Sequence, residues 1–227
     1  MTPPAYLPML AASGAGKLQG EWAVEPKLDG WRTIVTVDPA LPSGIEVRSR
    51  TGRFLTTQLP ELQGLADTGF RMVLDGELVA VSDHGDVDFY RLGERMLMRR
   101  PQRIVTLCAF DVLWLDGIDC TQLPYRDRRR VLEMLELSGP AWCTVPRFPI
   151  DDAEDLLDAC ARLCQEGIVL KRLDARYTPG VRTADWRKVK TAAWRTNHGP
   201  RRLPKEVSER ASLVCASAVA GSTRHDH

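Results

Sequence analysis

The chain has 227 residues, of which 44% are apolar and 27% are charged, and its 31 Lys and Arg nearly balance its 30 Asp and Glu. This composition excludes a wholly disordered protein, and the length suffices for one large domain or two small ones. No segment approaches the roughly 20 apolar residues of a membrane helix, and the N-terminus lacks the pattern of a secretion signal. We therefore expect a soluble, cytoplasmic protein with no membrane partner.

Segments rich in Val, Ile and Thr, separated by short turn clusters, predict strands at 22–28, 32–38, 45–50, 71–81, 103–115, 167–172 and 186–190. Apolar residues at helical spacing predict helices at 60–69, 88–99, 126–137 and 151–165. The strands outnumber the helices and do not alternate with them one to one. This order predicts an α+β fold of antiparallel β-sheets flanked by helices, rather than a doubly wound parallel sheet.

Regular patterning stops beyond residue 195. The last segment mixes Gly and Pro with small and charged residues, and only 206–220 resembles a weak helix. We expect residues 1–195 to form the folded domain and residues 196–227 to form a largely disordered tail.

The six cysteines are scattered, with no C-x-x-C pair of the kind that holds zinc or performs redox chemistry. We expect free thiols in a reducing compartment. Cys160 and Cys164 are one helical turn apart, which predicts that both lie on the buried face of one helix.

Positive charge is concentrated near the end of the domain. Residues 1–170 carry 18 basic and 25 acidic side chains, whereas residues 171–205 carry 11 basic ones against Asp174 and Asp185. Such a segment is typical of proteins that bind polyanions, including nucleotides and nucleic acids. The alternative is an ordinary solvated surface rich in arginine.

The segment EPKLDGWR at 25–32 is the first candidate for chemistry. A strand leads to Lys27, a turn is formed by Asp29 and Gly30, and Arg32 begins the next strand. A lysine amine beside a cleft is a competent nucleophile when its proton is removed. On its own, so short a motif favours an ordinary turn with a solvated lysine.

Further chemistry-bearing residues lie in later strands. Glu77 follows a turn in LDGELVA, Phe110 lies in FDVLWLDG, and Glu166 begins EGIVLKR. Lys188 and Lys190 of WRKVK are two apart, and therefore lie on one face of a strand. Alternation also places Arg48 and Arg50 of VRSRTGR on one face, so either is a candidate to contact phosphate.

Five of these segments, in this order, resemble the motifs of the covalent nucleotidyltransferase superfamily, and within it the ATP-dependent DNA ligases. EPKLDGWR resembles the nucleophile motif, and ARYTPGVRTADWRKVK at 175–190 is especially similar to bacterial ATP-dependent DNA ligases. The resemblance covers roughly residues 5–195. It implies the ATP-grasp-like adenylation fold of those ligases and an enzyme that uses ATP and Mg²⁺.

The resemblance implies that Lys27 attacks the α-phosphate of ATP, releases pyrophosphate and holds AMP as a phosphoramidate. It implies roles for eight further residues: adenine selection by Glu25, phosphate or ribose contacts by Arg32 and Arg50, adenine stacking by Phe110, phosphate neutralisation by Lys188 and Lys190, and Mg²⁺ coordination by Glu166 and Glu77. Each has a structural alternative, which is core packing for the aromatic ring, turn capping or pairing with Arg for the glutamates, and solvated strand edges for the lysines.

Ligases of this type continue past the fifth motif into an OB-fold, for which the roughly 30 residues after position 195 are too few. We therefore expect lysine adenylylation and nicked double-stranded DNA as the partner in repair or recombination. The chain is expected either to act on nicks as a minimal ligase or to assist their sealing together with a separate OB-fold or end-joining protein. The alternatives are a truncated, non-sealing module that binds nucleotide or nucleic acid, and an RNA ligase or capping-type nucleotidyltransferase.

Overall fold

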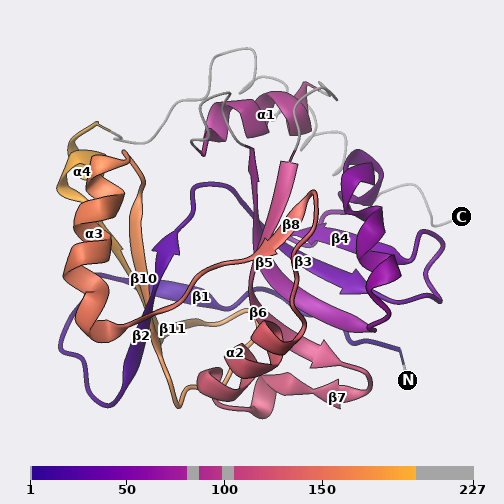
Figure 1. Ribbon diagram of the computed structural model, residues 1–227, viewed down its shortest axis with the longest axis horizontal. Helices are drawn as coiled ribbons and strands as arrows, with labels where there is room; N and C mark the ends of the chain where they lie inside the picture. Colours follow the sequence, from indigo (N-terminus) through magenta and orange to yellow (C-terminus); the bar gives the residue numbers. More distant parts are fainter. Residues whose placement is uncertain (1, 81–86, 99–104, 198–227) are drawn as a thin grey trace, which may run out of the picture.

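The computed structural model describes residues 2–80, 87–98 and 105–197, and its strands form two sheets (Figure 1). The first sheet has five strands, in the order β1 (Leu10–Ser13), β11 (Arg182–Lys190), β10 (Gly167–Arg172), β2 (Trp22–Lys27) and β9 (Phe148–Pro149). Its neighbouring strands run antiparallel except β1 and β11, which are parallel.

The second sheet has six strands. Its order is β4 (Ile45–Ser49), β3 (Trp31–Val37), β5 (Met72–Ala80), β6 (Val105–Leu115) and β7 (Ile118–Asp119), and β8 (Trp142–Thr144) also pairs with β6. The pair of β6 and β8 is parallel, and the other pairs are antiparallel. A three-residue turn joins β2 of the first sheet to β3 of the second.

Helices cover the outer faces and ends of the sheets. The described α-helices are α1 (Phe89–Leu97), α2 (Tyr125–Met134), α3 (Ala153–Arg162) and α4 (Ala192–Asn197), and the described 3₁₀ segments are Thr56–Gln58, Pro60–Thr68, Cys120–Gln122 and Ile150–Asp152. In Figure 1, α3 and α4 lie beside the first sheet, whereas α1 and α2 lie at opposite ends of the second. Asp88 starts α1 because its carboxylate accepts hydrogen bonds from the backbone N–H groups of Tyr90 and Arg91.

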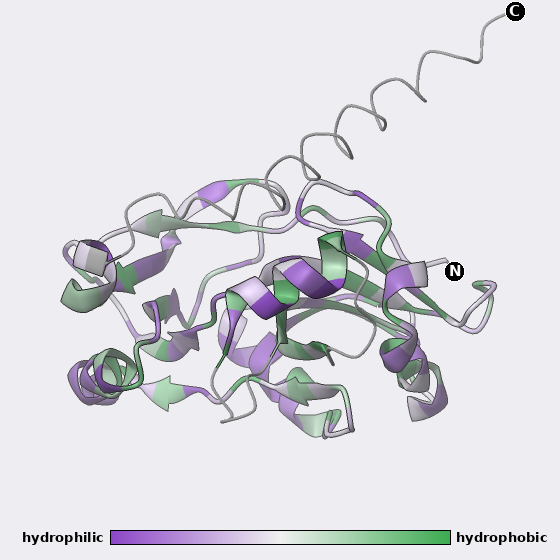
Figure 2. Ribbon diagram, turned by 90° about the horizontal axis from the view of Figure 1, so that it is seen from above, coloured by the Kyte–Doolittle hydropathy of each residue, from purple (hydrophilic) through white to green (hydrophobic). Residues whose placement is uncertain are grey.

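Three clusters of apolar side chains hold these layers together. The first packs the second sheet against α1, α2 and the 3₁₀ segment Pro60–Thr68, and the third packs α3 onto β2 and β10. The remaining cluster joins the two sheets, since it contains Ile34, Phe110 and Trp114 of the second sheet and Trp186 of the first. Figure 2 shows this layering from a second direction, with apolar residues on the strands between the layers. The sheets are therefore fixed to each other by packing beside the β2–β3 turn.

The predicted α+β class with mainly antiparallel sheets and flanking helices is confirmed. The predicted helix at 60–69 is a 3₁₀ segment rather than an α-helix. The placement of Cys164 was wrong: Cys160 is buried in α3, but Cys164 lies past the end of the helix with φ of 53° and is exposed. In the described ranges, no helix combines the length and the apolar character needed to cross a membrane.

The predicted tail of 196–227 lies outside the described residues from position 198 onward, together with the weak helix predicted at 206–220. Within the described part, α4 extends the regular structure to Asn197, two residues past the predicted boundary. The boundary at residue 195 and the tail stay predictions.

Candidate active site

The central residues of the site stand in rows across β2, β10 and β11. Lys27, Gly167 and Lys190 are register partners in one row, and Glu25, Val169 and Lys188 form the next. Side chains two apart on a strand share a face, so these rows place the acidic and basic groups on one face of the first sheet.

Lys27 and Lys190 meet at one carboxylate. Lys27 Nζ lies 2.7 Å from Glu166 Oε2, and Lys190 Nζ lies 2.7 Å from Glu166 Oε1. Burial by itself raises the pKa of Glu166, but the two lysines outweigh it and hold that pKa below its usual value. Glu166 is therefore an ionised carboxylate that holds two amines side by side.

Gly167 makes this close arrangement possible. It has φ of +147°, and a Cβ at this position would lie 2.1 Å from the carbonyl oxygen of Val189 on β11. Only glycine fits so close an approach of two backbones. The row between Lys27 and Lys190 consequently has no side chain in its centre.

Lys188 stands beside this cluster. Burial lowers its pKa most, and the positive charges of Lys27, Arg182 and Lys190 lower it further. Its side chain lines the main cavity, a concavity of about 170 Å³ that Lys27 also lines. A cavity lined by several cations concentrates positive potential where an anion would bind.

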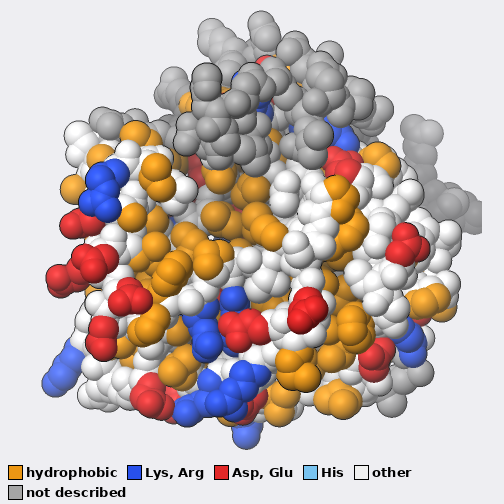
Figure 3. Space-filling model, in the orientation of Figure 1, with side chains coloured by type: hydrophobic (Ala, Val, Ile, Leu, Met, Phe, Trp, Pro, Cys, Tyr) orange, Lys and Arg blue, Asp and Glu red, His pale blue; other side chains and the backbone are white. Residues whose placement is uncertain are grey.

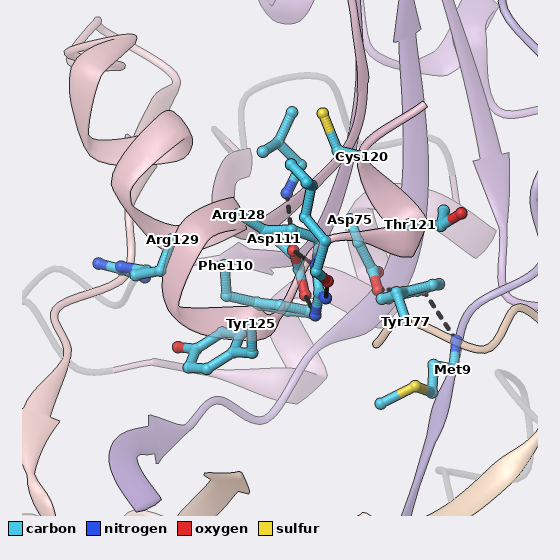
Figure 4. A network of polar contacts seen from close by, with 12 residues as sticks. Met9, Asp75, Phe110, Asp111, Cys120, Thr121, Tyr125, Arg128, Arg129 and Tyr177 are labelled. Atoms are coloured by element: carbon cyan, nitrogen blue, oxygen red, sulfur yellow. Dashed lines mark hydrogen bonds and ion pairs between the residues drawn. The ribbon is translucent and has the colours of Figure 1, made fainter. Parts of the chain in front are cut away.

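Glu25 lies at a buried part of the same cavity, with both carboxylate oxygens occupied. Its Oε2 lies 2.6 Å from Lys171 Nζ, while its Oε1 accepts the hydroxyl hydrogen of Tyr125 and lies 3.4 Å from Arg129 Nη1. Figure 4 shows Tyr125 and Arg129 on α2 beside Phe110 of β6. Glu25 is only 2% exposed, so its geometry is set by these neighbours rather than by water.

Arg32 is held by a second buried network. Its Nε and Nη2 both donate to Asp75, which also accepts a hydrogen bond from Tyr177 at 2.5 Å. Figure 4 shows Tyr177 between Asp75 and the backbone of Met9. The Arg32 guanidinium lies 4.3 Å from the centre of the Phe110 ring, within cation–π range. Arg32 lines the main cavity while most of its hydrogen-bonding capacity is already used.

Phe110 is mostly buried, with 8% of its surface exposed, and contacts Trp186 edge to face. It belongs to the cluster between the sheets and also lines the main cavity. Packing and ligand contact are thus compatible roles for this ring, and adenine stacking stays a prediction.

Glu77 and Arg50 line the cavity from the second sheet. Burial raises the pKa of Glu77 to about 7, against the opposing effects of Arg32 and Lys27, and within the described residues no hydrogen bond to its carboxylate occurs. A half-buried carboxylate that accepts no hydrogen bond from the described residues is suited to receive a cation or a hydroxyl group from a ligand. Arg50 lies in the turn after β4, whereas Arg48 pairs with Glu46 and stacks on Phe54 at 4.0 Å. Of the two arginines, only Arg50 lines the cavity.

Lys27 also lines a second, smaller cavity. Its lining includes Asp29 and Glu166 and, from α4, Trp194. Lys27 and Leu28 line both cavities.

All of the predicted site residues except Glu166 and Lys190 line the main cavity, and those two contact each other beside Lys27. Their individual roles stay predictions. Sequence reasoning gave no role to Lys171, Trp186 or Arg182, which also line it. Continued alternation would have revealed the first two: Lys171 is two residues from Val169, and Trp186 is two residues from Lys188. Arg182 precedes the irregular register between β1 and β11, where alternation fails.

The protein-family model described as the ATP dependent DNA ligase domain matches residues 8–190 of the sequence. The chain belongs to this family, and its fold is that of the nucleotidyltransferase domains of these ligases. The sequence-based recognition of the family is therefore confirmed.

Individual proteins that are similar to this chain are also DNA ligases or contain a DNA ligase. The multifunctional non-homologous end joining protein LigD of Mycolicibacterium smegmatis is 35% identical over 198 residues, covering 86% of this chain and 24% of that protein. A probable DNA ligase of Streptomyces coelicolor is 37% identical over 206 residues, covering 81% and 39%. The structure of a mycobacterial DNA ligase D complexed with ATP and MES is similar with a TM-score of 0.71 and 35% identity, covering 82% of this chain and 60% of that one. The chain thus spans about a quarter of the LigD protein that it matches.

Proposed function

We propose that this chain is the adenylylating module of an ATP-dependent DNA ligase, and that Lys27 accepts AMP from ATP as a covalent lysyl-AMP. The observation that carries the proposal is the position of the Lys27 amine, 2.7 Å from Glu166 at the edge of a cavity that Lys188 also lines. Nucleophilic attack by a lysine requires loss of its proton, and the contact with Glu166 provides an acceptor for it.

In the proposed reaction, the Lys27 nitrogen attacks the α-phosphorus of ATP, and the bond from phosphorus to the pyrophosphate oxygen breaks. Glu166 is the nearest group to take the proton that the amine must lose. Lys188 and Lys190 stabilise the negative charge that builds on the phosphate, and they do so without rearrangement because strand β11 already holds them.

The donor set also fits Mg²⁺. Glu166 and Glu77 offer carboxylate oxygens, and a hard cation of this kind takes one or two carboxylates together with substrate phosphates. No cluster of three or more metal-ligating side chains occurs in the described ranges, which agrees with a metal shared with the nucleotide. When bound, Mg²⁺ would neutralise phosphate charge.

Glu25 is the proposed selector of adenine. An ionised carboxylate accepts hydrogen bonds but donates none, so it favours the amino group of adenine over the carbonyl oxygen of guanine. Lys171, Tyr125 and Arg129 occupy the remaining directions around Glu25 and fix its orientation. Phe110 is the proposed contact for the base ring, and Arg32 and Arg50 for the ribose and phosphates.

Nicked double-stranded DNA is the proposed partner, and β11 the proposed contact surface. Arg182 and Arg187 donate to backbone carbonyls, and among the described residues neither pairs with a carboxylate. The basic residues of α2 differ: Arg126 and Arg130 lie 3.3 and 3.2 Å from Glu21 and Asp127. Figure 3 shows acidic and basic side chains intermixed near α2, on the face seen in the orientation of Figure 1. Unpaired cations bind DNA phosphates better than paired ones.

The relatives extend the proposal to end-joining repair in a bacterial cytoplasm, with the module at the nucleoid when bound to DNA. We also propose that a separate OB-fold or end-joining protein assists nick sealing, since the similar LigD proteins act in end joining.

The test incubates the purified chain with Mg²⁺ and α-labelled ATP or GTP, followed by denaturation. We expect retained label from ATP alone, and its loss in Lys27→Ala. The exposed Lys17 is the matched control, and Lys17→Ala should label normally. Equal labelling of both variants would refute the role of Lys27, and ATP binding without label would indicate a non-catalytic binding module. A second assay with nicked DNA and nicked RNA reports sealing and sugar preference.

A further inference from the structure

Two cysteines face each other across neighbouring strands. Cys108 of β6 and Cys143 of β8 are register partners in the parallel pair, and their sulfur atoms are 3.7 Å apart. The thiols of Cys120 and Cys160 instead contact the carbonyl oxygens of Ile118 and Gly167. All five described cysteines are free thiols.

The backbone geometry allows a bond between the two sulfurs. Adjacent strands are about 4.8 Å apart, which falls within the range of about 4.4–6.8 Å between the Cα atoms of a disulfide. The sulfurs need to approach by about 1.7 Å to reach the disulfide bond length of about 2.0 Å. Side-chain rotation and a small shift of the short strand β8 can provide this.

The two thiols differ in a way that suits stepwise oxidation. Cys143 is half-buried and thus within reach of a small molecule, whereas Cys108 is 8% exposed. The contact with the Cys108 sulfur lowers the pKa of Cys143 to about 7, while the same contact and burial raise the pKa of Cys108. Cys143 therefore has the greater thiolate fraction at neutral pH.

We propose that Cys108 and Cys143 form a modification site, in which a small-molecule disulfide such as oxidised glutathione converts the two thiols into a reversible protein disulfide. The Cys143 thiolate attacks one glutathione sulfur, the glutathione S–S bond breaks, and one glutathione leaves as a thiolate that takes up a proton. Cys108 then attacks the Cys143 sulfur, and its proton goes to the second departing glutathione. The protein loses two electrons, and one oxidised glutathione becomes two reduced molecules.

We expect the disulfide to change the shape of the main cavity. That this cavity holds the nucleotide rests on the proposed function. Cys108 is the register partner of Glu77 on β5 and lies two residues before Phe110, and both neighbours line the cavity. β8 is also anchored near Glu25, since Arg129 donates to the carbonyl oxygen of Val145 directly after this strand. A disulfide that pulls β6 and β8 together would displace Phe110 and Glu77 from their positions around the nucleotide.

The test treats the purified chain with oxidised glutathione and then blocks the remaining thiols. Trypsin yields the peptides 104–126 and 131–147, which contain Cys108 and Cys143 respectively. We expect these peptides to be joined by a dithiothreitol-sensitive bond in mass spectra. Fragment ions distinguish Cys108 from Cys120 of the same peptide. Cys108→Ala and Cys143→Ala should each abolish the crosslink, and Cys164→Ser, which changes an exposed thiol, should retain it.

The labelling rate with ATP is then compared in reduced and oxidised protein. Because a displacement of positioned groups by about 1 Å can cost up to about 100-fold in rate, we expect oxidation to slow lysyl-AMP formation by about tenfold or more, with full recovery after reduction. Cys143→Ala should keep its rate under oxidant. Absence of the crosslink in mass spectra would overturn the modification site, and an unchanged rate in fully crosslinked protein would overturn its effect on the cavity. If reduced protein takes up no label at all, the proposed function fails, while the mass spectra still decide the modification site.

Discussion

The ion pair between Arg128 and Asp111 should be a major determinant of stability. Both side chains are fully buried, and Arg128 donates to the two carboxylate oxygens at 2.8 and 2.9 Å. Its Nη1 also donates to the carbonyl oxygens of Leu123 and Ala175. Figure 4 shows how this contact ties α2 to β6 next to Phe110. We expect Arg128→Met to be strongly destabilising.

The magnitude follows from what the substitution leaves behind. Met preserves most of the volume of the arginine stem, so the cost is mainly electrostatic. Removing one member of a buried ion pair costs about 3–5 kcal/mol, because the other charge stays buried without compensation. The backbone N–H of Val112 still donates to Asp111, but the two carbonyl oxygens lose a donor, which adds about 1 kcal/mol. The expected loss of about 4–6 kcal/mol is a large part of the free energy of unfolding of a typical domain.

Urea unfolding followed by circular dichroism measures this loss. For an m-value near 3 kcal/mol/M, the midpoint should fall by about 1.3–2 M. Arg130→Met is the matched control, because Arg130 lies on the same helix, is 72% exposed and pairs with Asp127 on the surface; we expect a change of about 0.5 kcal/mol or less. Arg128→Met combined with Asp111→Leu should recover much of the lost stability. Equal effects of Arg128→Met and Arg130→Met would refute the reasoning.

Other predictions concern the cavity. Because burial raises the pKa of Glu77 to about 7, its ionisation lowers the free energy of unfolding progressively as the pH rises from the usual glutamate range to about 7; the stability gained by Glu77→Gln in urea unfolding should therefore be larger at pH 8 than at pH 5, and an equal gain at both would contradict this sign. Tyr125→Phe removes a donor from the buried Glu25 and should weaken ATP binding about tenfold in calorimetry, with less discrimination against GTP; unchanged discrimination would argue against Glu25 as the base selector. Arg50→Ala should raise the KM for ATP about tenfold, whereas Arg48→Ala, which removes a side chain paired outside the cavity, should leave it unchanged, and the reverse pattern would show that the wrong arginine was chosen.

Long elements of this fold could be predicted because each repeats its pattern several times. The strands β3, β5 and β6 have between seven and eleven residues and were predicted within two residues of their ends. The exception is β11, of which only the last five of nine residues were predicted. The strands β7, β8 and β9 have two or three residues, which is too short for alternation to be recognised. Their positions depend on pairing with distant partners, as β8 does with β6, and such contacts are not encoded locally.

The sequence motifs singled out Lys27 and Glu166, and the structure places these two side chains in contact, while their roles stay predictions. The buried partners of Glu25 could not be predicted in the same way. Lys171 lies in a predicted strand, but its position beside Glu25 follows from the register of β10 against β2. Tyr125 and Arg129 reach the same carboxylate from α2, about a hundred residues away in sequence. Register and tertiary packing decide these partners, and no spacing in one chain specifies them.

The turn between Lys27 and Trp31 links the two sheets through three residues. Gly30 at its end has no room for a side chain, because a Cβ would lie 2.1 Å from the carbonyl oxygen of Leu78 on β5. Lys27, Lys188 and Lys190 belong to the first sheet, whereas Glu77 and Phe110 belong to the second and Arg50 directly follows its strand β4. The short turn sets the distance between Lys27 on the first sheet and the cavity residues on the second. Inserting even one residue into this turn would change that distance, although every reactive side chain would still be present.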